Sequence, residues 1–240
     1  AFLPHIRNIF LTAGGRAGIS SPTDGTRLSG TTRASADIKQ NSHLNNEDED
    51  HMIDAFTVET AHLLGDALPA LHRLRHKIFV ERHGYQVPTY RGMEWDTFDT
   101  PAAVYLLWRD DLQQVRAIAR LIPTTFPYMI KELWPELIYG RELPSRPDVW
   151  EVTRLGVDRA LAPALRRRVF GEMMCACGEF GRRMGISEYY LVTHPWVIRS
   201  IEANGCRVRM LGHTRAIGRC VVKAAAMQIS DAAIATLRRT

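Results

Sequence analysis

The sequence predicts one domain of the α/β class, built on a mixed sheet. Segments with an apolar residue at every second position alternate along the chain with segments in which apolar residues recur every three or four positions. Two pairs of strand-like segments have the pattern of hairpins, which places antiparallel strands beside the helix-connected ones. The chain has 240 residues, of which 45% are hydrophobic, so it can bury one sizeable core.

The first 51 residues are expected to be a disordered leader. Residues 16–51 are rich in Ser, Thr, Gly, Asn and acidic side chains and have almost no large apolar ones, so burial cannot offset the entropy lost on ordering. Because Met52 opens the first strand-like segment, we expect natural translation to begin there. Residues 52–240 would then form the whole folded domain.

The first half of that domain is expected to contain a strand, a helix and a hairpin. Apolar residues recur at helical spacing from Thr60 to His83, and Pro69 is expected to divide this segment, leaving residues 70–83 as the continuous helix. The expected strands cover residues 52–58, 103–108 and 114–122. A polar turn joins the last two strands, and Pro123 ends the hairpin.

The second half continues with two strand-helix units and a final hairpin. Pro163 suits the first turn of a helix over residues 164–183, and Gly185 suits its end. A strand over residues 150–157 precedes this helix. The elements expected after it are a strand at 188–193, a helix at 196–203, and hairpin strands at 207–211 and 220–229.

Composition and motifs exclude several functions. No apolar stretch approaches the roughly 20 residues of a membrane-spanning helix, and no glycine-rich phosphate loop is present, which disfavours nucleotide hydrolysis. The opening segment lacks the long apolar core of a secretory signal. The close pair Cys175 and Cys177 would point about 200° apart on a helix, which indicates small buried thiols in a reducing compartment. We therefore expect a cytoplasmic protein.

Charged residues form the most informative pattern in the sequence. Glu94, Asp96 and Asp99 lie within six residues in an aromatic context, which alone is typical of a solvated acidic loop. Three further charges lie inside otherwise apolar strands: Arg120, Glu151 and Arg154. Burying an unpaired charge is costly, so these residues are expected to face a partner or a ligand.

The order and spacing of these charges resemble the signature of the acyl-homoserine lactone synthase family. The matching positions are Arg75-x3-Phe79, Glu94-x-Asp96-x2-Asp99, Arg120 and Glu151-x-Thr153-Arg154, and the resemblance covers roughly residues 52–220. It implies a GNAT-type N-acetyltransferase-like fold, a three-layer sandwich, which agrees with the expected order of elements. The family usually has a Trp six residues after the Phe. Tyr85 stands there instead, so an aromatic wall is kept while the indole donor is lost.

The resemblance implies that the substrates are S-adenosylmethionine and an acyl thioester, with no cofactor. Six residues would shape the S-adenosylmethionine pocket: Arg75, Phe79, Tyr85, Asp96, Asp99 and Arg120. This substrate carries an amine, a sulfonium and a carboxylate, so its site needs carboxylates and at least one arginine. Which carboxylate would face the ligand stays open.

The implied reaction makes a diffusible quorum-sensing signal in two steps. The amine attacks the thioester, and the carboxylate then displaces methylthioadenosine to close a lactone. A base must neutralise the amine, with Glu94 the first candidate and Glu151 the second, and Arg154 is expected in the same catalytic group. Backbone N–H groups of a splayed central strand would stabilise the oxyanion.

The acyl side is expected around the helix that begins near residue 164. Arg166, Arg167 and Arg168 would meet phosphopantetheine or the acidic face of acyl carrier protein, or else lie on a solvated helix face. The acyl pocket is expected to include Phe126 and Thr193, and the strand over residues 189–193 with two further aromatics, Tyr128 and Trp134, could line it or belong to the core. Either acyl carrier protein or coenzyme A could deliver the acyl group.

Three alternatives are weaker. His72 and His76 have the i, i+4 spacing of a zinc pair, but no third ligand is apparent, so no metal site is expected. An acetyl-CoA-dependent N-acetyltransferase of the same fold would need a glycine-rich pyrophosphate loop after residue 158. A nucleic-acid-binding module would need clustered cations with exposed aromatics. The net charge is only +5 and its arginines are scattered, so no nucleic acid partner is expected.

Overall fold

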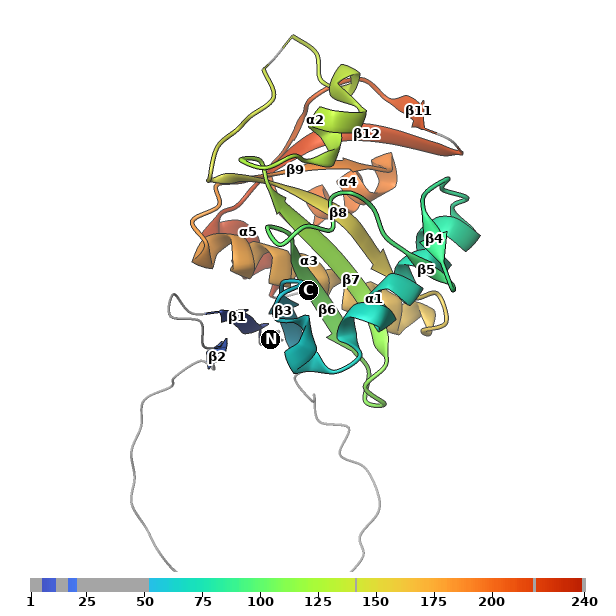
Figure 1. Ribbon diagram of the computed structural model, residues 1–240. Helices are drawn as coiled ribbons and strands as arrows, with labels where there is room; N and C mark the ends of the chain where they lie inside the picture. The colour runs from blue at the N-terminus through green and yellow to red at the C-terminus, as the bar shows by residue number, and fades with distance from the viewer. Residues whose placement is uncertain (1–5, 12–16, 21–51, 141, 218, 239–240) are drawn as a thin grey trace, which may run out of the picture.

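A mixed ten-stranded sheet is the centre of the molecule (Figure 1). The computed structural model describes residues 6–11, 17–20, 52–140, 142–217 and 219–238. The strand order is β10-β12-β9-β8-β7-β6-β3-β1-β2, and β11 pairs with β12 outside this path. The strands are β1 (Ile6–Leu11), β2 (Ala17–Ser20), β3 (Ile53–Phe56), β6 (Val104–Arg109), β7 (Val115–Pro123), β8 (Val149–Val157), β9 (Glu188–Thr193), β10 (Val208–Met210), β11 (Arg215–Ile217) and β12 (Cys220–Gln228).

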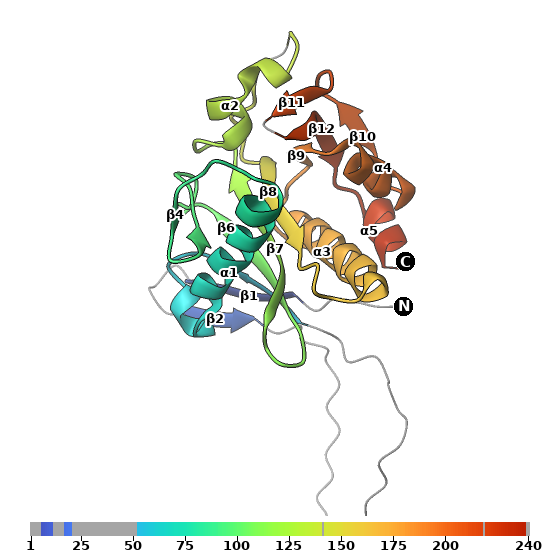
Figure 2. The ribbon, with the colours of Figure 1, turned by 90° about the vertical axis from the view of Figure 1, so that its right-hand side faces the viewer.

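Helices cover both faces of this sheet, which gives three layers (Figure 2). Helix α1 (Ala67–Arg75) continues into the π-helix η2 (His76–Arg82) on one face, while α3 (Pro163–Arg183) lies on the other. Strand β6 alternates between the two: Leu106 and Trp108 pack in the core with α3, while Tyr105 and Leu107 pack in the core with α1. The predicted α/β class and mixed sheet are confirmed.

The leader differs from the expectation in two short segments. Strand β1 pairs in parallel with β3 and in antiparallel with β2, and it extends the sheet at the edge that β3 would otherwise form. Ile6 is buried against this edge, and Arg7 forms an ion pair with the buried Asp54, which explains why a polar leader can order here. Residues 1–5, 12–16 and 21–51 lie outside the described part, where the disordered leader stays a prediction.

The helical segment of the first half is longer than predicted and changes its hydrogen-bond pattern. Pro69 does not divide it, because Pro69 lies in the first turn of α1, where its missing N–H would have no helical partner. After Arg75 the chain winds as a π-helix, with His83 N donating to Ile78 O. Phe79 lies inside this wide helix and is buried.

The hairpin β6-β7 and the later elements match their predicted ranges closely. Strand β9 has the predicted ends, and α3 begins at Pro163, one residue before the prediction. Several short elements were not predicted: η1 (Ala61–Leu64), β4 (Thr89–Tyr90), β5 (Met93–Glu94), α2 (Met129–Leu133), η3 (Pro135–Leu137), β11 and α5 (Asp231–Leu237). Helix α4 (Pro195–Ala203) follows β9 directly.

The parallel strands β8 and β9 separate part-way along their length. Helix α3 connects them, as a parallel pair requires, but their pairing covers only Val149–Val152 on β8 and Glu188–Leu191 on β9. Beyond these residues β8 continues beside β7 alone. The gap that opens between β8 and β9 is the place where the functional cavity lies.

In the part of the chain that the structure describes, no helix combines the length and apolar character needed to cross a bilayer.

Candidate active site

A buried group of ion pairs joins α1, the loop after β5, and strands β7 and β8. Arg75 is the last residue of α1, and its guanidinium donates from Nε to Glu94 Oε2 at 2.6 Å and from Nη1 to Asp99 Oδ1 at 2.6 Å. Tyr105 on β6 also donates to Asp99 Oδ1, at 2.9 Å. These contacts fix the β5 hairpin and its following loop against the helix end.

Arg120 holds the acidic loop from the sheet side. Its Nη1 donates to Asp96 Oδ1 at 2.6 Å and to Asp99 Oδ1 at 2.7 Å, and its Nε donates to Thr153 Oγ1 at 3.0 Å. The loop itself is closed by Asp96 N donating to Asp99 Oδ2 at 2.8 Å. Arg120, which was expected to face a partner or a ligand, thus has carboxylate partners in the acidic loop.

A β-bulge brings Arg154 into the same group. The register between β7 and β8 shifts between Arg120 and Ile118, and Arg154 has φ of +51°, in the left-handed region that non-glycine residues rarely occupy. This backbone turn directs the guanidinium to Glu94 Oε1 at 2.9 Å and Asp96 Oδ2 at 2.8 Å. Local strain at this position is therefore compensated by two buried ion pairs.

The group contains three arginines and three carboxylates, so its charges balance. Arg75 and Arg154 lower the pKa of Glu94 even though burial alone would raise it. Arg75 and Arg120 likewise hold the pKa of Asp99 far below its usual range, against the opposing effect of burial. Both carboxylates are ionised at neutral pH and are poor proton acceptors.

Glu151 has the opposite environment. Its side chain is buried on β8, and its two carboxylate oxygens accept hydrogen bonds from the backbone N–H groups of Met129 at 2.7 Å and Ile130 at 2.9 Å. Burial raises the pKa of Glu151 to about 7, although these hydrogen bonds lower it in part. A carboxyl group with this pKa can exchange a proton at physiological pH.

Aromatic rings form the wall beside this group. The rings of Phe79 and Tyr85 lie 5.7 Å apart, and the guanidinium carbon of Arg154 lies 5.2 Å from the centre of the Phe79 ring. Burial and the neighbouring Cys220 raise the pKa of Tyr85 to about 12, so its hydroxyl stays protonated. Such faces suit a cationic group with apolar substituents.

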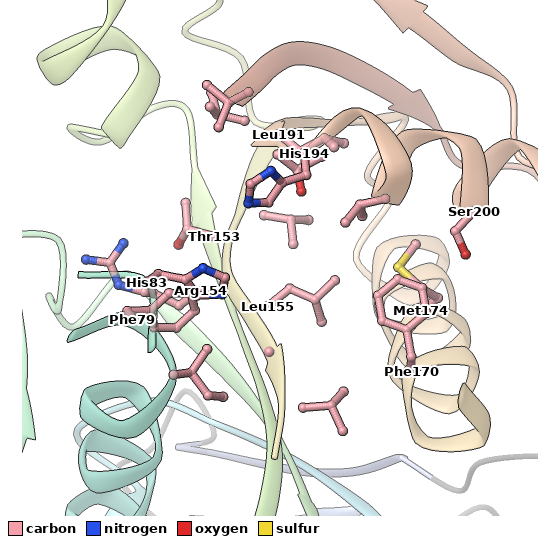
Figure 3. Close-up of a pocket in the computed structure, with 18 of the residues that line it drawn as sticks. Phe79, His83, Thr153, Arg154, Leu155, Phe170, Met174, Leu191, His194 and Ser200 are labelled. Carbon is pink, nitrogen blue, oxygen red and sulfur yellow. The ribbon is translucent and has the colours of Figure 1, made fainter. Parts of the chain in front are cut away.

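One large cavity connects these features with the other side of the sheet gap (Figure 3). Its volume is about 1570 Å³, and it passes from Phe79 and Arg154 across β8 to Phe170 and Met174 on α3. Asp96 and Glu151 also line it, whereas Arg75, Glu94 and Arg120 do not and lie behind the wall. The cavity thus has a charged end and an apolar end.

The described chain resembles known proteins over most of its length. A family model described as autoinducer synthase matches residues 61–237. The chain belongs to the autoinducer synthase family. An acyl-homoserine-lactone synthase of Aeromonas salmonicida is 33% identical over 151 residues, which cover 61% of this chain and 72% of that relative.

Solved structures support the same assignment for this synthase. The CoA-dependent acyl-homoserine lactone synthase BjaI, solved with MTA, superposes with a TM-score of 0.72 at 32% identity, covering 79% of this chain and 88% of that one. BjaI has also been solved with SAM and isopentyl-CoA, and that structure gives a TM-score of 0.71. An N-acetyltransferase from Lactobacillus plantarum, at 16% identity and a TM-score of 0.51, shares the fold, so the GNAT-like architecture is confirmed.

The synthase places the predicted acyl-side residues in different surroundings. Thr193 and Trp134 line the cavity. Phe126 does not: it is 52% exposed, because it lies in the turn after β7, where its N–H donates to Pro123 O. Tyr128 is buried in the core and donates to Pro144 O at 2.9 Å.

Arginines surround the α3 side of the cavity. Arg166, Arg167 and Arg168 all line it, together with Arg159 and Arg82. Arg166 donates to the backbone oxygens of Arg159 and Leu161, and Arg168 pairs with Glu172 at 2.8 Å. The predicted cationic patch therefore lies at the cavity of the synthase rather than on a remote helix face.

Most of the apolar end and one group of side chains could not be recognised from the sequence. Leu155 on β8, Phe170 and Met174 on α3, and Ser200 on α4 line the cavity but resemble ordinary core residues in the sequence. His72 and His76, paired by spacing, have different partners in the structure: His72 Nδ1 contacts Glu94 O and His76 Nδ1 contacts Glu81 Oε1. His83, His194 and Cys220, which are distant in sequence, lie together instead.

Proposed function

We propose that this chain makes acyl-homoserine lactones for quorum sensing, by joining an acyl thioester to S-adenosylmethionine. The observation that carries this proposal is the single cavity, whose charged and aromatic end is continuous with its apolar end across β8. The two ends suit the amino acid part of one substrate and the acyl chain of the other. The ligands of BjaI, which are SAM, MTA and isopentyl-CoA, support the same pair of substrates.

S-Adenosylmethionine binds at the charged end. Asp96 and Arg154 are the members of the ion-pair group that reach the cavity, so they contact the amine and the carboxylate of the substrate. Phe79 and Tyr85 offer ring faces to the sulfonium and its neighbouring carbons. Arg75, Asp99 and Arg120 act through these residues by fixing the loop and the bulge, and they are positioning residues.

Glu151 is the base for acyl transfer, and the order of candidates from the sequence is reversed. Glu94 is held by two guanidinium groups and its pKa is lowered, whereas the pKa of Glu151 is about 7 and its carboxyl lines the cavity. The amine nitrogen bonds to the thioester carbon, the C–S bond breaks, and the amine proton passes to Glu151 directly or through one water. Glu151 then passes this proton to the leaving thiolate, which departs as the free thiol.

The second step closes the lactone ring, and here too the nucleophile belongs to the substrate. An oxygen of the substrate carboxylate bonds to the carbon that carries the sulfonium, and the C–S bond breaks to release neutral methylthioadenosine. In the preceding acyl-transfer step, the oxyanion of the tetrahedral intermediate is stabilised by backbone N–H groups of β8. These groups lie beyond Val152, where pairing with β9 has ended.

The acyl donor enters from the arginine-rich side. Arg159, Arg166 and Arg167 give this mouth a positive potential that attracts the phosphates of coenzyme A or of an acyl carrier protein. The acyl chain then lies between α3 and α4, against Phe170 and Met174. Both substrates are cytoplasmic metabolites, and the four cysteines are free thiols, which supports a cytoplasmic location.

The direct test is turnover by the purified full chain with S-adenosylmethionine and a panel of acyl-CoA and acyl carrier protein thioesters. We expect methylthioadenosine and an acyl-homoserine lactone in equal amounts, identified by mass spectrometry, with the donor chosen by the panel. Acyl transfer to an amine without methylthioadenosine release would instead assign an N-acyltransferase. Folded protein that consumes no thioester in the panel would contradict the proposal.

A further inference from the structure

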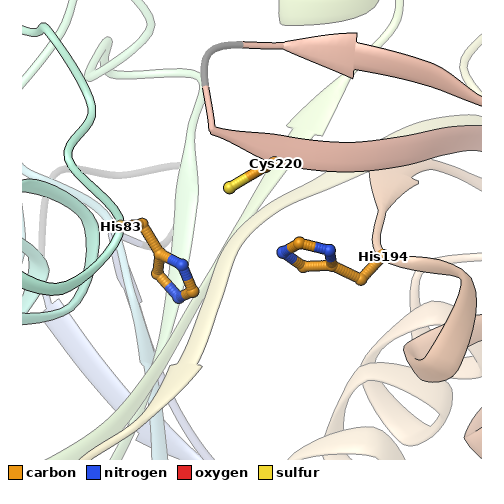
Figure 4. A group of neighbouring side chains, drawn as sticks. All are labelled: His83, His194 and Cys220. Atoms are coloured by element: carbon orange, nitrogen blue, oxygen red, sulfur yellow. The ribbon is translucent and has the colours of Figure 1, made fainter.

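Two imidazoles and a thiol from three separate elements meet at the cavity (Figure 4). His83 follows η2, His194 lies between β9 and α4, and Cys220 is the first residue of β12. Their ligand atoms lie within 4.8 Å of one another. Figure 4 shows the three side chains pointing toward a common point in front of β8.

The three groups are available for ligation. Among the residues that the structure describes, neither imidazole has a hydrogen-bond partner for its ring nitrogens. The thiol of Cys220 has a hydrogen bond with the Tyr85 side chain, which a bound ion would replace.

We propose that His83, His194 and Cys220 form a binding site for a zinc-class transition-metal ion inside the substrate cavity. One thiolate and two imidazoles are a ligand set that zinc prefers, with a fourth position left open. Around a tetrahedral zinc ion such ligand atoms lie about 3.3 to 3.6 Å apart. Side-chain rotations that move each atom by roughly 1 Å would therefore complete the site.

The position of the site implies what a bound ion does. His83 and His194 both line the cavity, their ring centres lie 6.0 Å apart, and the His83 ring is stacked on Phe79. An ion that joins them occupies the part of the cavity beside Phe79, where the thioester carbon must approach the amine. If the proposed function holds, on which this role rests, a bound zinc ion inhibits the enzyme by competing with the acyl thioester.

The binding test needs no turnover. The full chain, stripped with a chelator and exchanged into metal-free buffer, is titrated with Co²⁺ and then with competing Zn²⁺. We expect one ion per chain, a thiolate-to-cobalt charge-transfer band and the intense visible bands of four-coordinate cobalt. Cys220→Ser should remove the charge-transfer band, and His194→Gln should weaken binding by more than about tenfold.

Matched variants separate this site from other thiols and histidines. Cys206→Ala, a buried cysteine elsewhere, and His62→Gln, an exposed histidine, should keep the wild-type spectrum and stoichiometry. His83→Gln serves as an independent ligand variant if Cys220→Ser fails to fold, as judged by circular dichroism. Absence of the charge-transfer band in the wild type, or equal binding by ligand and control variants, would overturn the metal site.

Inhibition is tested separately on the active enzyme. Zn²⁺ should raise the apparent KM for the acyl thioester, with an inhibition constant that matches the dissociation constant from cobalt displacement. In His194→Gln this constant should rise by more than about tenfold. Binding without any effect on turnover would overturn the inhibitory role, whereas a chain without turnover would contradict the proposed function and leave the cobalt result to decide the site.

Discussion

At the scale of single residues, Glu94 and Glu151 show how one fold gives two carboxylates different chemistry. Glu94 is fully buried between Arg75 and Arg154, which lower its pKa. Glu151 is equally buried but accepts only backbone N–H groups, and its pKa is raised to about 7. Divergent pKa values of this kind separate a structural anion from an acid-base catalyst.

Replacing Glu151 by Gln should remove the base while keeping a similar shape. We expect kcat to fall by about 10² to 10⁴. In the wild type, the carboxyl must be ionised to accept a proton, so kcat/KM should rise with pH up to about 7 and then level off. The variant should lose this limb in a pH-rate profile. A folded Glu151→Gln enzyme with wild-type turnover and an unchanged limb would remove Glu151 from the mechanism.

Stability provides a second readout for the same residue. Because the pKa of Glu151 is raised from 4.5 to about 7 on folding, its protonated form is favoured in the folded state. Its contribution to stability is therefore present at low pH and is lost as pH rises through 7. The difference in Tm between wild type and Glu151→Gln should therefore change between pH 4.5 and about 7. A constant difference would mean that folding does not raise the pKa of Glu151.

Glu94→Gln should act mainly on stability. The substitution leaves three buried arginines with two carboxylates, so we expect the free energy of unfolding to fall by about 3 to 5 kcal/mol. The measurement is urea denaturation at pH 7. Asp148→Asn, at an exposed ion pair with Arg146, is the matched control and should change stability little. Equal effects of the two substitutions would contradict the buried network.

At the scale of elements, the sequence predicted which charges belong together but not how they meet. Burial of charge in the strands led us to expect partners for Arg120 and Arg154, and the family resemblance implied that Glu94, Asp96 and Asp99 belong to the same site. The bulge at Arg154 and the π-helix after Arg75 depend on long-range packing, and no local pattern encodes them. The metal-ligand group could not be found either, because its members lie on three elements that only the tertiary fold brings together.

Gly156 on strand β8 lies close to the side chains of the π-helix. A Cβ built there would lie 2.9 Å from Ile78 Cδ1 and 3.6 Å from Phe79 Cζ. Glycine therefore permits the contact that sets the position of the aromatic wall. The packing of these two elements, and not only the identity of Phe79, determines the shape of the S-adenosylmethionine end.

Gly156→Ala should push η2 away from the strand. We expect a loss of stability of about 1 to 3 kcal/mol and a higher KM for S-adenosylmethionine, measured with saturating thioester. Ile78→Val removes the carbon nearest to the added Cβ. The double variant Gly156→Ala/Ile78→Val should therefore recover part of the lost stability and part of the KM for S-adenosylmethionine. Gly171→Ala in α3, where a Cβ meets nothing within 4 Å, should instead gain up to about 1 kcal/mol. Failure of Ile78→Val to compensate would contradict this explanation.

At the scale of the whole molecule, periodicity predicted the central elements well and the edges poorly. Strands β6 to β9 and helices α3 and α4 are long and strongly patterned, and their predicted ranges differ from the structure by one or two residues at most. Short elements such as α2 and β4 have too few residues to show a period. Strand β1 was missed because its order depends on β3 and Asp54 rather than on its own composition.

Removal of the N-terminal strands β1 and β2 should lower stability and leave turnover unchanged. Because the charged and aromatic end and Glu151 come from residues 75–154, a chain of residues 52–240 should keep the kcat/KM of the full chain.

The shorter chain should be less stable, since the buried Asp54 loses Arg7, whose Nη2 lies 2.6 Å from its carboxylate. Burial already raises the pKa of Asp54, and without Arg7 that pKa rises further. Loss of the β1–β3 pairing and of the buried Ile6 should give a deficit at every pH, and the part due to Arg7 should be absent at low pH, where Asp54 is protonated, and grow as pH rises toward 7. Thermal unfolding of both chains across this range measures it, and Asp54→Asn should reduce the deficit at pH 7. If the shorter chain is folded but inactive, the leader contributes to the site.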